Sequence, residues 1–422
     1  MDTDKSNMPQ TAGTDTTRQE SLFIKLLLPA MAFFATWGDG LQQIIPFQAS
    51  KIFVVLTGLL LLHWVLVMRA KLAFPRAMTL FVLFMLLHTI VVFTLIPQEF
   101  SFGKTGISTI QSGFERIGES IDITILRVFT FIAMAYALAR EIKNRNQIVI
   151  FSFFYACGLL AVYLMGGYVM TDLYETRQAG GYLDPNSFGL SGLIAVFLGI
   201  ISFNYADNLR WKLLSLLGPL TGVMVLLASS SRGNMVGTFC GVLLLIAVSK
   251  LGQKLKTVLI IACILVISLL SLPDEYLQTL NLRFDLNRLT YDKGAGRLII
   301  WQDYLRYWKD YVVTGVGLER SMTVLTNRCT RYQVPHNVYI QLLVEFGLPG
   351  LLLFLAAIVT FFRRLRNIPG KYPFMAILTA WLVSSFFLGT LESRDTWLIF
   401  GIICGACRIA TQQDTPAGSR GR

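Results

Sequence analysis

The stretch NVYIQLLVEFGLPGLLLFLAAIVTFF, residues 337–362, decides what kind of protein this is. It is long enough to cross a bilayer as a helix, which takes about 20 mostly apolar residues. Glu345 is the single charged residue in it. The stretch is therefore predicted to be a transmembrane helix.

Apolar stretches of similar length recur along the whole chain, between short polar interruptions. Hydrophobic residues make up 54% of the sequence and charged residues 15%, whereas a soluble domain carries nearer a quarter charged residues. We therefore expect an all-α integral membrane protein with about 12 transmembrane helices. The predicted spans are 21–37, 52–68, 77–96, 123–139, 147–170, 188–204, 213–228, 235–249, 257–272, 337–362, 373–390 and 396–411.

The polar interruptions divide the chain unequally. Residues 1–20 are polar, lack the pattern of a cleaved signal peptide and are predicted to form a disordered cytoplasmic tail, as are residues 412–422. Between the tails, 21–272 should hold the first nine helices and 337–411 the last three. The segment 273–336 is then one large loop, predicted to contain amphipathic helices.

Orientation follows from the positions of lysine and arginine in the short loops. With both termini in the cytoplasm, the short inner loops hold fifteen basic residues and the short outer loops hold six. The inner residues are Arg69, Lys71, Arg76, Arg140, Lys143, Arg145, Arg210, Lys212, Lys250, Lys254, Lys256, Arg363, Arg364, Arg366 and Lys371. The large loop 273–336 is therefore predicted to lie outside the cytoplasm.

This topology accounts for most of the net charge of +12, so the charge predicts no nucleic-acid partner. Five of the six cysteines fall in predicted spans, which leaves Cys329 alone in an outer loop. No disulfide framework is expected.

The large outer loop contains RLIIWQDYLRYWKDYV, residues 297–312, in which apolar residues recur at helical spacing. Such an amphipathic helix could lie on the membrane surface or pack on the transmembrane bundle, and the sequence does not distinguish these arrangements. Its aromatic residues could likewise stack on sugars or line the membrane interface.

Three outer arginines oppose the charge bias of the loops and lie in unusual surroundings. Arg232 follows a serine run in SSSRGN (229–234), Arg297 follows glycines in KGAGR, and Arg177 precedes a Gly-Gly pair. Guanidinium groups present forked donors that match phosphate oxygens, so these arginines are candidate diphosphate ligands. Pairing with nearby acids or lipid head groups is the alternative.

His336 is one of only three histidines and lies behind Pro335, where the large loop meets span 337–362. A neutral imidazole near pH 7 can accept a proton, so His336 is the candidate general base. No outer residues show the spacing of metal ligands, and we expect no metal. Glu345 and Arg127, both inside spans, could serve a proton or substrate pathway or a contact between helices.

Together these motifs resemble the O-antigen ligase and polymerase superfamily of bacterial envelope glycosyltransferases. The matching pieces are GGYLDPNSFG (180–189), SSSRGN (229–234), GAGRLIIW (294–301), VTGVGLE (313–319) and PHNVYIQLLVEFGLPG (335–350). They occur in the order typical of the superfamily and cover roughly the C-terminal 60% of the chain. The chain length and the small amount of soluble sequence are most similar to the O-antigen ligases.

The resemblance implies an enzyme of lipopolysaccharide biosynthesis in the bacterial inner membrane, with its active site on the periplasmic side. The donor would be a glycan linked to undecaprenyl diphosphate and the acceptor lipid A–core, with no cofactor or metal and with membrane lipids as further partners. By the resemblance, His336 is catalytic and Arg232 and Arg297 bind the diphosphate, whereas Arg177 matches the family less well. The possible supporting residues are Asn186, Ser231 and Asn337.

Two other functions share part of this pattern. An O-antigen polymerase uses the same kind of donor and differs in its acceptor, so the motifs do not separate it from a ligase. A transporter or flippase for a lipid-linked glycan would also carry outer arginines and polar residues inside the membrane.

Overall fold

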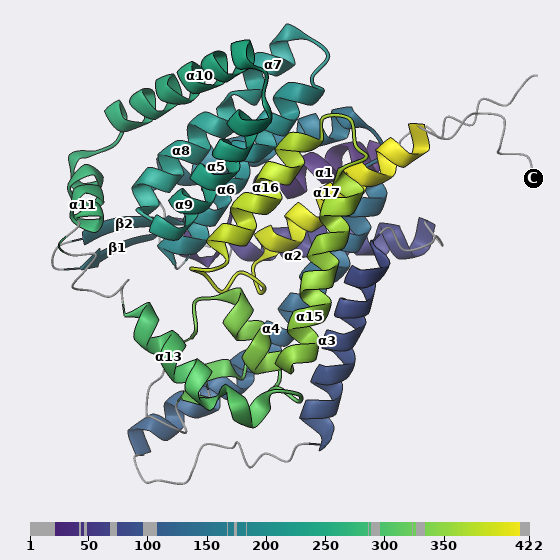
Figure 1. Cartoon of the computed structure of the whole chain (residues 1–422), viewed down its shortest axis with the longest axis vertical. Coiled ribbons are helices and arrows are strands. Elements are labelled where there is room, and N and C mark those ends of the chain that lie inside the picture. The colour runs from purple at the N-terminus through teal and green to yellow at the C-terminus, as the bar shows by residue number, and fades with distance from the viewer. Residues whose placement is uncertain are drawn as a thin grey trace, which may run out of the picture.

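The computed structural model is a helical bundle with one short β-hairpin at its side (Figure 1). It describes residues 22–41, 44–45, 49–67, 74–95, 108–166, 168–172, 175–182, 184–285, 287, 296–322, 324–325 and 334–413. The helices are α1 (Leu22–Phe34), α2 (Ala49–Val67), α3 (Arg76–Leu95), α4 (Ser108–Glu141), α5 (Arg145–Met165), α6 (Pro185–Tyr205), α7 (Leu209–Ser215), α8 (Leu217–Ser229), α9 (Arg232–Val248), α10 (Leu251–Leu270), α11 (Asp274–Phe284), α13 (Arg297–Tyr307), α15 (Val338–Leu365), α16 (Lys371–Ser384) and α17 (Arg394–Gln413). Two 3-10 turns, η1 (Asp39–Leu41) and η3 (Trp308–Tyr311), complete the helical elements named here.

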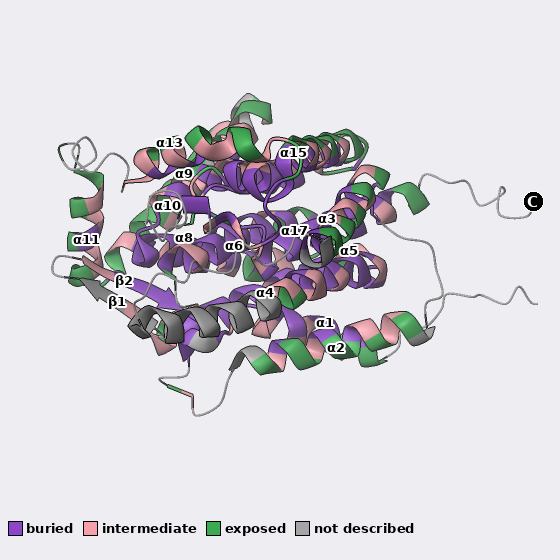
Figure 2. Cartoon of the chain, turned by 90° about the horizontal axis from the view of Figure 1, so that it is seen from below, coloured by how far each residue is buried: buried purple, intermediate pink, exposed green. Residues whose placement is uncertain are grey.

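The centre of the bundle is α6, which is buried along most of its length (Figure 2). It packs against α5, α8, α9 and α16. The contact with α8 is close because small residues face each other: a Cβ on Gly222 would lie 2.4 Å from the carbonyl oxygen of Gly192. Small residues of this kind let helix backbones approach each other in membrane proteins.

The remaining helices surround this centre in pairs. Helix α17 packs along α4, α1 lies between α5 and α2, and α15 packs against α3. Aromatic side chains fill the interior, and Trp381 of α16 and Trp397 of α17 are both completely buried. The structure thus brings the two ends of the sequence into one core.

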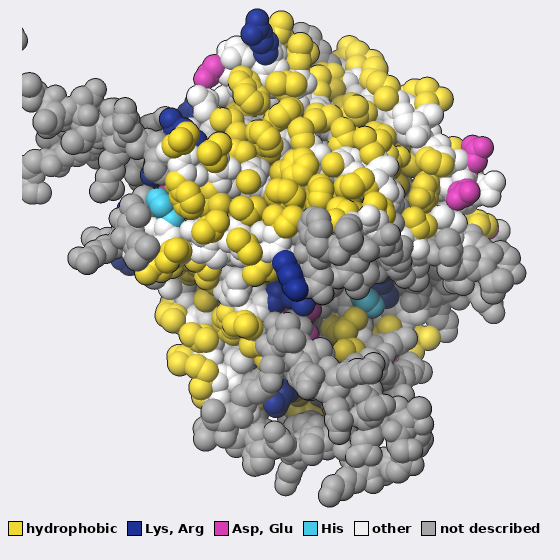
Figure 3. Space-filling model, turned by 180° about the vertical axis from the view of Figure 1, so that it is seen from behind, with side chains coloured by type: hydrophobic (Ala, Val, Ile, Leu, Met, Phe, Trp, Pro, Cys, Tyr) yellow, Lys and Arg dark blue, Asp and Glu magenta, His cyan; other side chains and the backbone are white. Residues whose placement is uncertain are grey.

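The outer surface of the bundle is strongly apolar. Val65 of α2, Leu87 of α3 and Leu259 of α10 are 64%, 60% and 55% exposed, respectively. Figure 3 shows hydrophobic side chains covering a wide part of one face, with charged groups at its margins. Exposed apolar surface of this extent is typical of contact with lipid.

Each of the twelve predicted spans overlaps a helix of the structure. Four described stretches are long and apolar enough for a bilayer crossing: Arg145–Met165, Pro185–Tyr205, Leu209–Ser229 and Val338–Leu365. A fifth is possible if Val258–Leu270 and Asp274–Phe284, bent by 118°, form one broken span. The chain is therefore a multi-pass membrane protein, while twelve crossings remain a prediction.

The β-hairpin was not predicted from the sequence. Helix α5 ends at Met165, short of the predicted end at 170, and Gly166 follows with φ of +81°. Strands β1 (Tyr168–Asp172) and β2 (Glu175–Gly180) then pair antiparallel. Helix α11 packs on β2, so the hairpin joins the bundle to the helix that follows α10.

The amphipathic helix predicted at 297–312 is present as α13 followed by η3. Its buried side chains, Ile300 and Tyr304, form a small separate core with Ile340 and Val344 of α15. The structure therefore packs α13 on the bundle, with part of its apolar surface still exposed.

Two further predicted boundaries are wrong. The span predicted at 123–139 is part of a longer helix, because α4 is helical from Ser108. The span predicted at 373–390 is helical only as far as Ser384, and the residues after it form a loop. This loop, 385–393, contributes to the site described next.

Candidate active site

His336 lies at the junction between the large loop and α15, as predicted. Two hydrogen bonds hold this junction. The indole Nε1 of Trp301, in α13, donates to the carbonyl oxygen of Pro335 at 2.8 Å. The amide of Val338 donates to the carbonyl oxygen of Ser385, just after α16, at 2.9 Å. His336 itself has φ of +46°, a left-handed conformation rare for a residue with a side chain. Strained backbone that is held from both sides is common in functional sites.

Asn337 begins α15 as its N-cap. Its side-chain oxygen accepts hydrogen bonds from the amides of Tyr339 at 2.9 Å and Ile340 at 3.1 Å. The side chain is buried, so its role in the structure is to fix the start of α15 beside His336.

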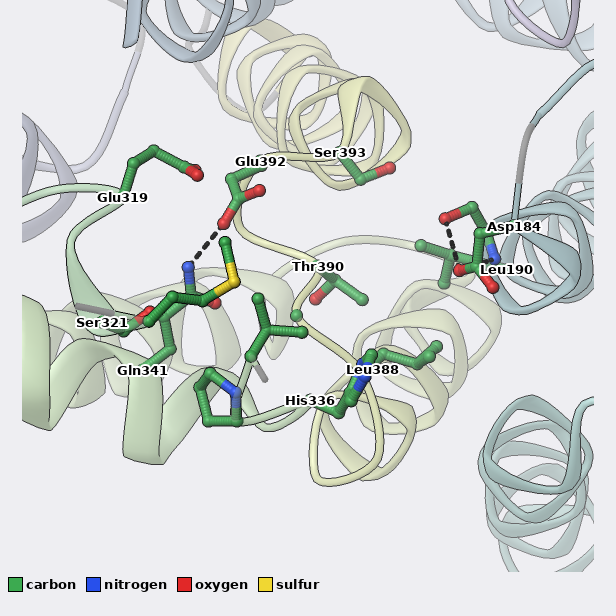
Figure 4. Close-up of a pocket in the computed structure, with 15 residues that line it drawn as sticks. Asp184, Leu190, Glu319, Ser321, His336, Gln341, Leu388, Thr390, Glu392 and Ser393 are labelled. Carbon is green, nitrogen blue, oxygen red and sulfur yellow. Dashed lines mark hydrogen bonds between the residues drawn. The ribbon is translucent and has the colours of Figure 1, made fainter. Parts of the chain in front are cut away.

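His336 faces a cavity of about 160 Å³. Figure 4 shows Asp184 on one side of it and Glu319 and Glu392 on another, with Thr390 between them. The lining comes from the start of α6, the segment after Gly317, the junction at His336, α15 and the loop 385–393. Segments far apart in the sequence therefore meet in one hollow.

The surroundings of His336 favour its neutral form. Burial lowers the pKa of His336 below its ordinary value, and the positive charge of Arg297 lowers it further, while the negative charge of Asp184 acts in the opposite direction. Neutral imidazole is the form that accepts a proton. The structure thus places Arg297 near enough to His336 for their charges to interact.

Arg297 is the first residue of α13, directly after Gly296, whose φ is +73°. Arg232 is likewise the first residue of α9 and lies two residues after Ser230, whose φ is +47°. Amide groups at a helix start point outward and carry partial positive charge. Both predicted diphosphate ligands therefore combine a guanidinium with a helix N-terminus.

Arg232 is half-buried, and its Nη1 donates to the carbonyl oxygen of Arg283 at 3.4 Å. Arg283, at the end of α11, in turn donates to the Glu175 carboxylate at 2.6 Å. Arg283 was not predicted as a site residue, since no motif surrounds it.

Arg177 is bound closely to the protein. Its Nε donates to the carbonyl oxygen of Ser229 at 2.8 Å, and its Nη2 donates to Oδ1 of Asn186 at 3.1 Å. Burial and the charge of Arg283 lower the pKa of Arg177 to about 10, so it stays cationic at neutral pH. Its charge also interacts with that of Arg297, so Arg177 lies within charge range of both Arg283 and Arg297.

The two other predicted supporting residues contact each other. The hydroxyl of Ser231 donates to Oδ1 of Asn186 at 3.1 Å, and Nδ2 of Asn234 donates to the Asn186 carbonyl oxygen at 2.7 Å. These bonds join the start of α9 to the start of α6. The N-termini of α6 and α9 are thereby held side by side near Arg177.

The acidic lining of the cavity was missed at the sequence level. Asp184 is the N-cap of α6 and belongs to a turn singled out for its glycines and proline. Glu319 and Glu392 lie in segments after predicted helices, and their sequence surroundings give no signal of proximity. Among the described residues, no group of three or more His, Cys, Asp or Glu side chains is placed to hold a metal ion.

Residues 217–355 match the family model described as O-antigen ligase. The match runs from α8 into α15 and includes Arg232, Arg297 and His336. No curated protein matches the sequence. The resemblance seen in the motifs is thus confirmed over this region, and the part of the chain that carries the candidate base and the two arginines belongs to the O-antigen ligase family.

Proposed function

We propose that the protein is an O-antigen ligase. It transfers O-antigen polysaccharide from undecaprenyl diphosphate to lipid A–core on the periplasmic face of the inner membrane. The observation that carries the proposal is the position of His336, which lines a cavity while lying within charge range of Arg297. A base and a cation placed together suit a reaction in which a hydroxyl loses its proton as a diphosphate leaves.

Arg232 and Arg297 have the role of binding the donor diphosphate. Their guanidinium groups and the helix starts to which they belong stabilise the negative charge that grows on the diphosphate as the glycosidic bond breaks. Two cations here supply the charge compensation that Mg²⁺ supplies in other phosphoryl-linked transfers, so the reaction needs no metal. Arg177 contributes positive charge and holds Asn186 and Ser229 in place.

His336 accepts the proton of the acceptor hydroxyl while the hydroxyl oxygen attacks the anomeric carbon of the donor sugar. The bond to the diphosphate breaks on the opposite face, so the configuration at the anomeric carbon inverts. The leaving product is undecaprenyl diphosphate. The proton then passes from His336 to solvent.

The first test is glycan transfer by purified protein in detergent, with lipid diphosphate-linked O-antigen, lipid A–core and a chelator. We expect wild-type transfer that falls by about 10²- to 10⁴-fold in His336→Ala, the usual range for loss of a general base. Arg232→Ala should fall by about 10²- to 10³-fold, the usual loss for one preorganised donor.

Arg232→Lys distinguishes a forked donor from a simple positive charge. Lysine that restores full transfer would contradict two-pronged recognition of the diphosphate. A well-folded wild type that extends the lipid-linked glycan, and does not transfer it to lipid A–core, would instead identify a polymerase.

A further inference from the structure

The cavity beside His336 has a chemically distinct second wall. Opposite Asp184, the side chains of Glu319, Gln341 and Glu392 line it (Figure 4). The arginines assigned to the donor diphosphate are not among the lining residues. The hollow therefore suits a group other than the diphosphate.

Gln341 connects the carboxylates of this wall. Its Nε2 donates to Oε1 of Glu392 at 2.5 Å and to Oε1 of Glu345 at 3.3 Å. Glu345 lies completely buried in α15, directly behind the wall. One amide group thus holds two carboxylates from different elements in fixed positions.

The wall has hydrogen-bonding capacity that the described residues do not use. Oε1 of Glu319 is buried without a hydrogen-bond partner in the described part of the chain, although the carboxyl groups of Glu319 and Glu392 lie close enough to share a hydrogen bond. A buried polar atom of this kind is costly unless a ligand or water satisfies it. Glu319 lines the cavity, which is the space from which such a partner would come.

Carboxyl groups on the wall select the kind of partner. Burial raises the pKa of Glu319, the charges of Glu392 and Glu345 raise it further, and the charge of Arg127 acts in the opposite direction, so the protonated, neutral form of Glu319 is favoured. Carboxyl groups exchange hydrogen bonds with hydroxyl groups and accept them from ammonium groups, whereas the described residues that line the cavity include no lysine or arginine to balance a phosphate or carboxylate. The cavity is also smaller than the ~300 Å³ at which drug-sized pockets begin, so it admits the end of a ligand.

We propose that this wall, formed by Glu319, Gln341 and Glu392, binds the terminal sugar of the acceptor and presents one of its hydroxyl groups to His336. The sugar is neutral or bears an amino group, without a phosphate or carboxylate next to the reacting hydroxyl. This inference rests on the proposed function and adds to it the site and the class of the acceptor. The donor diphosphate then lies among arginines and the acceptor sugar among carboxyl groups, on the two sides of the base.

The test compares Glu392→Gln and Glu319→Gln with wild type in steady-state transfer, varying donor and acceptor separately. The matched control is Glu275→Gln, an exposed glutamate of α11 outside the cavity. We expect Glu392→Gln to raise the acceptor KM at least tenfold and to leave the donor KM within twofold. The control should change neither value, and equal melting temperatures will show that all variants fold.

An unchanged acceptor KM in both cavity variants would overturn the proposal, as would a donor KM that rises by the same factor. Direct binding keeps the test independent of catalysis. Core oligosaccharide released from lipid A should bind wild type at least tenfold more tightly than Glu392→Gln, while both bind undecaprenyl diphosphate equally.

A second probe addresses the charge of the sugar. Core oligosaccharide with a phosphate on its terminal residue should bind wild type at least tenfold more weakly than the unphosphorylated form, and Glu392→Gln should narrow that difference. Equal binding of the two forms by wild type would contradict the proposal. If wild type binds the oligosaccharide in this way yet transfers no glycan to it, the proposed reaction fails and the acceptor site stands.

Discussion

At the scale of the residue, the contacts and charges around His336 are what make this side chain a candidate base. Trp301 fixes the carbonyl oxygen before it, and Asn337 caps the helix after it. Arg297 and Asp184 set the charge around it from two other elements. The sequence predicted the histidine and both arginines of the motif, because each stands beside a proline, serine run or glycine pair that marks a special turn.

The pH dependence of transfer tests these charges. Since the pKa of His336 is lowered, the neutral base persists below pH 6.5, and kcat/KM for the acceptor should start to fall only at lower pH. Arg297→Gln removes a positive neighbour, so the fall should move to higher pH. Asp184→Asn removes a negative neighbour and should move it to lower pH.

These shifts are read from complete pH profiles of kcat/KM for wild type and both variants. Asparagine can still cap α6, so Asp184→Asn controls for loss of the helix start. Profiles that shift in the same direction, or that do not move, would mean that His336 is not the titrating base.

At the scale of the element, α15 is the helix predicted from residues 337–362. A break inside this helix fixes how it packs on the neighbouring segment. Gly347 has φ of +66° and breaks the helix, and Pro349 follows. The amide of Leu348 then donates to the carbonyl oxygen of Val312 at 2.7 Å, so the break attaches α15 to the segment after η3. Hydropathy predicted the length of this helix but gave no information on its shape.

Gly347→Ala should therefore destabilise the protein. A Cβ there would lie 2.6 Å from the carbonyl oxygen of Val313, and the backbone of Gly347, with φ of +66° and ψ of −172°, is essentially restricted to glycine and costs another residue about 1–3 kcal/mol. Gly58→Ala on α2 is the control, because nothing lies within 4 Å of that Cβ and alanine favours helix. Thermal unfolding in detergent should show a lower melting temperature for Gly347→Ala alone, and equal values would contradict this account.

At the scale of the whole molecule, the packing of helices creates the site. The starts of α6, α9, α13 and α15 gather around His336 and the arginines, although they are distant in sequence. The apolar exterior of the same bundle makes contact with lipid (Figure 3). The same packing of helices therefore exposes apolar side chains to lipid and brings the residues of the candidate site together.

The predicted orientation places α13 and η3 outside the cytoplasm and the start of α10 inside it. In a cysteine-free background, Lys309→Cys should react with a membrane-impermeant maleimide in intact spheroplasts, whereas Lys250→Cys should react only after permeabilisation. Both lysines are exposed, so accessibility to the reagent depends on the side of the membrane alone. The reverse pattern would place the site in the cytoplasm and exclude the proposed periplasmic reaction.

The sequence by itself determined the membrane class and the approximate positions of the helices, and it supplied His336, Arg232 and Arg297 as candidate site residues. Apolar length and special turns are local properties, and local properties can be read from neighbouring residues. Tertiary structure alone decided that Glu319 and Glu392 face the same cavity as His336, that Arg283 joins the cations, and that a hairpin follows α5. These features depend on contacts between distant segments, which the packing of buried helices fixes and which leave no periodic signal in the chain.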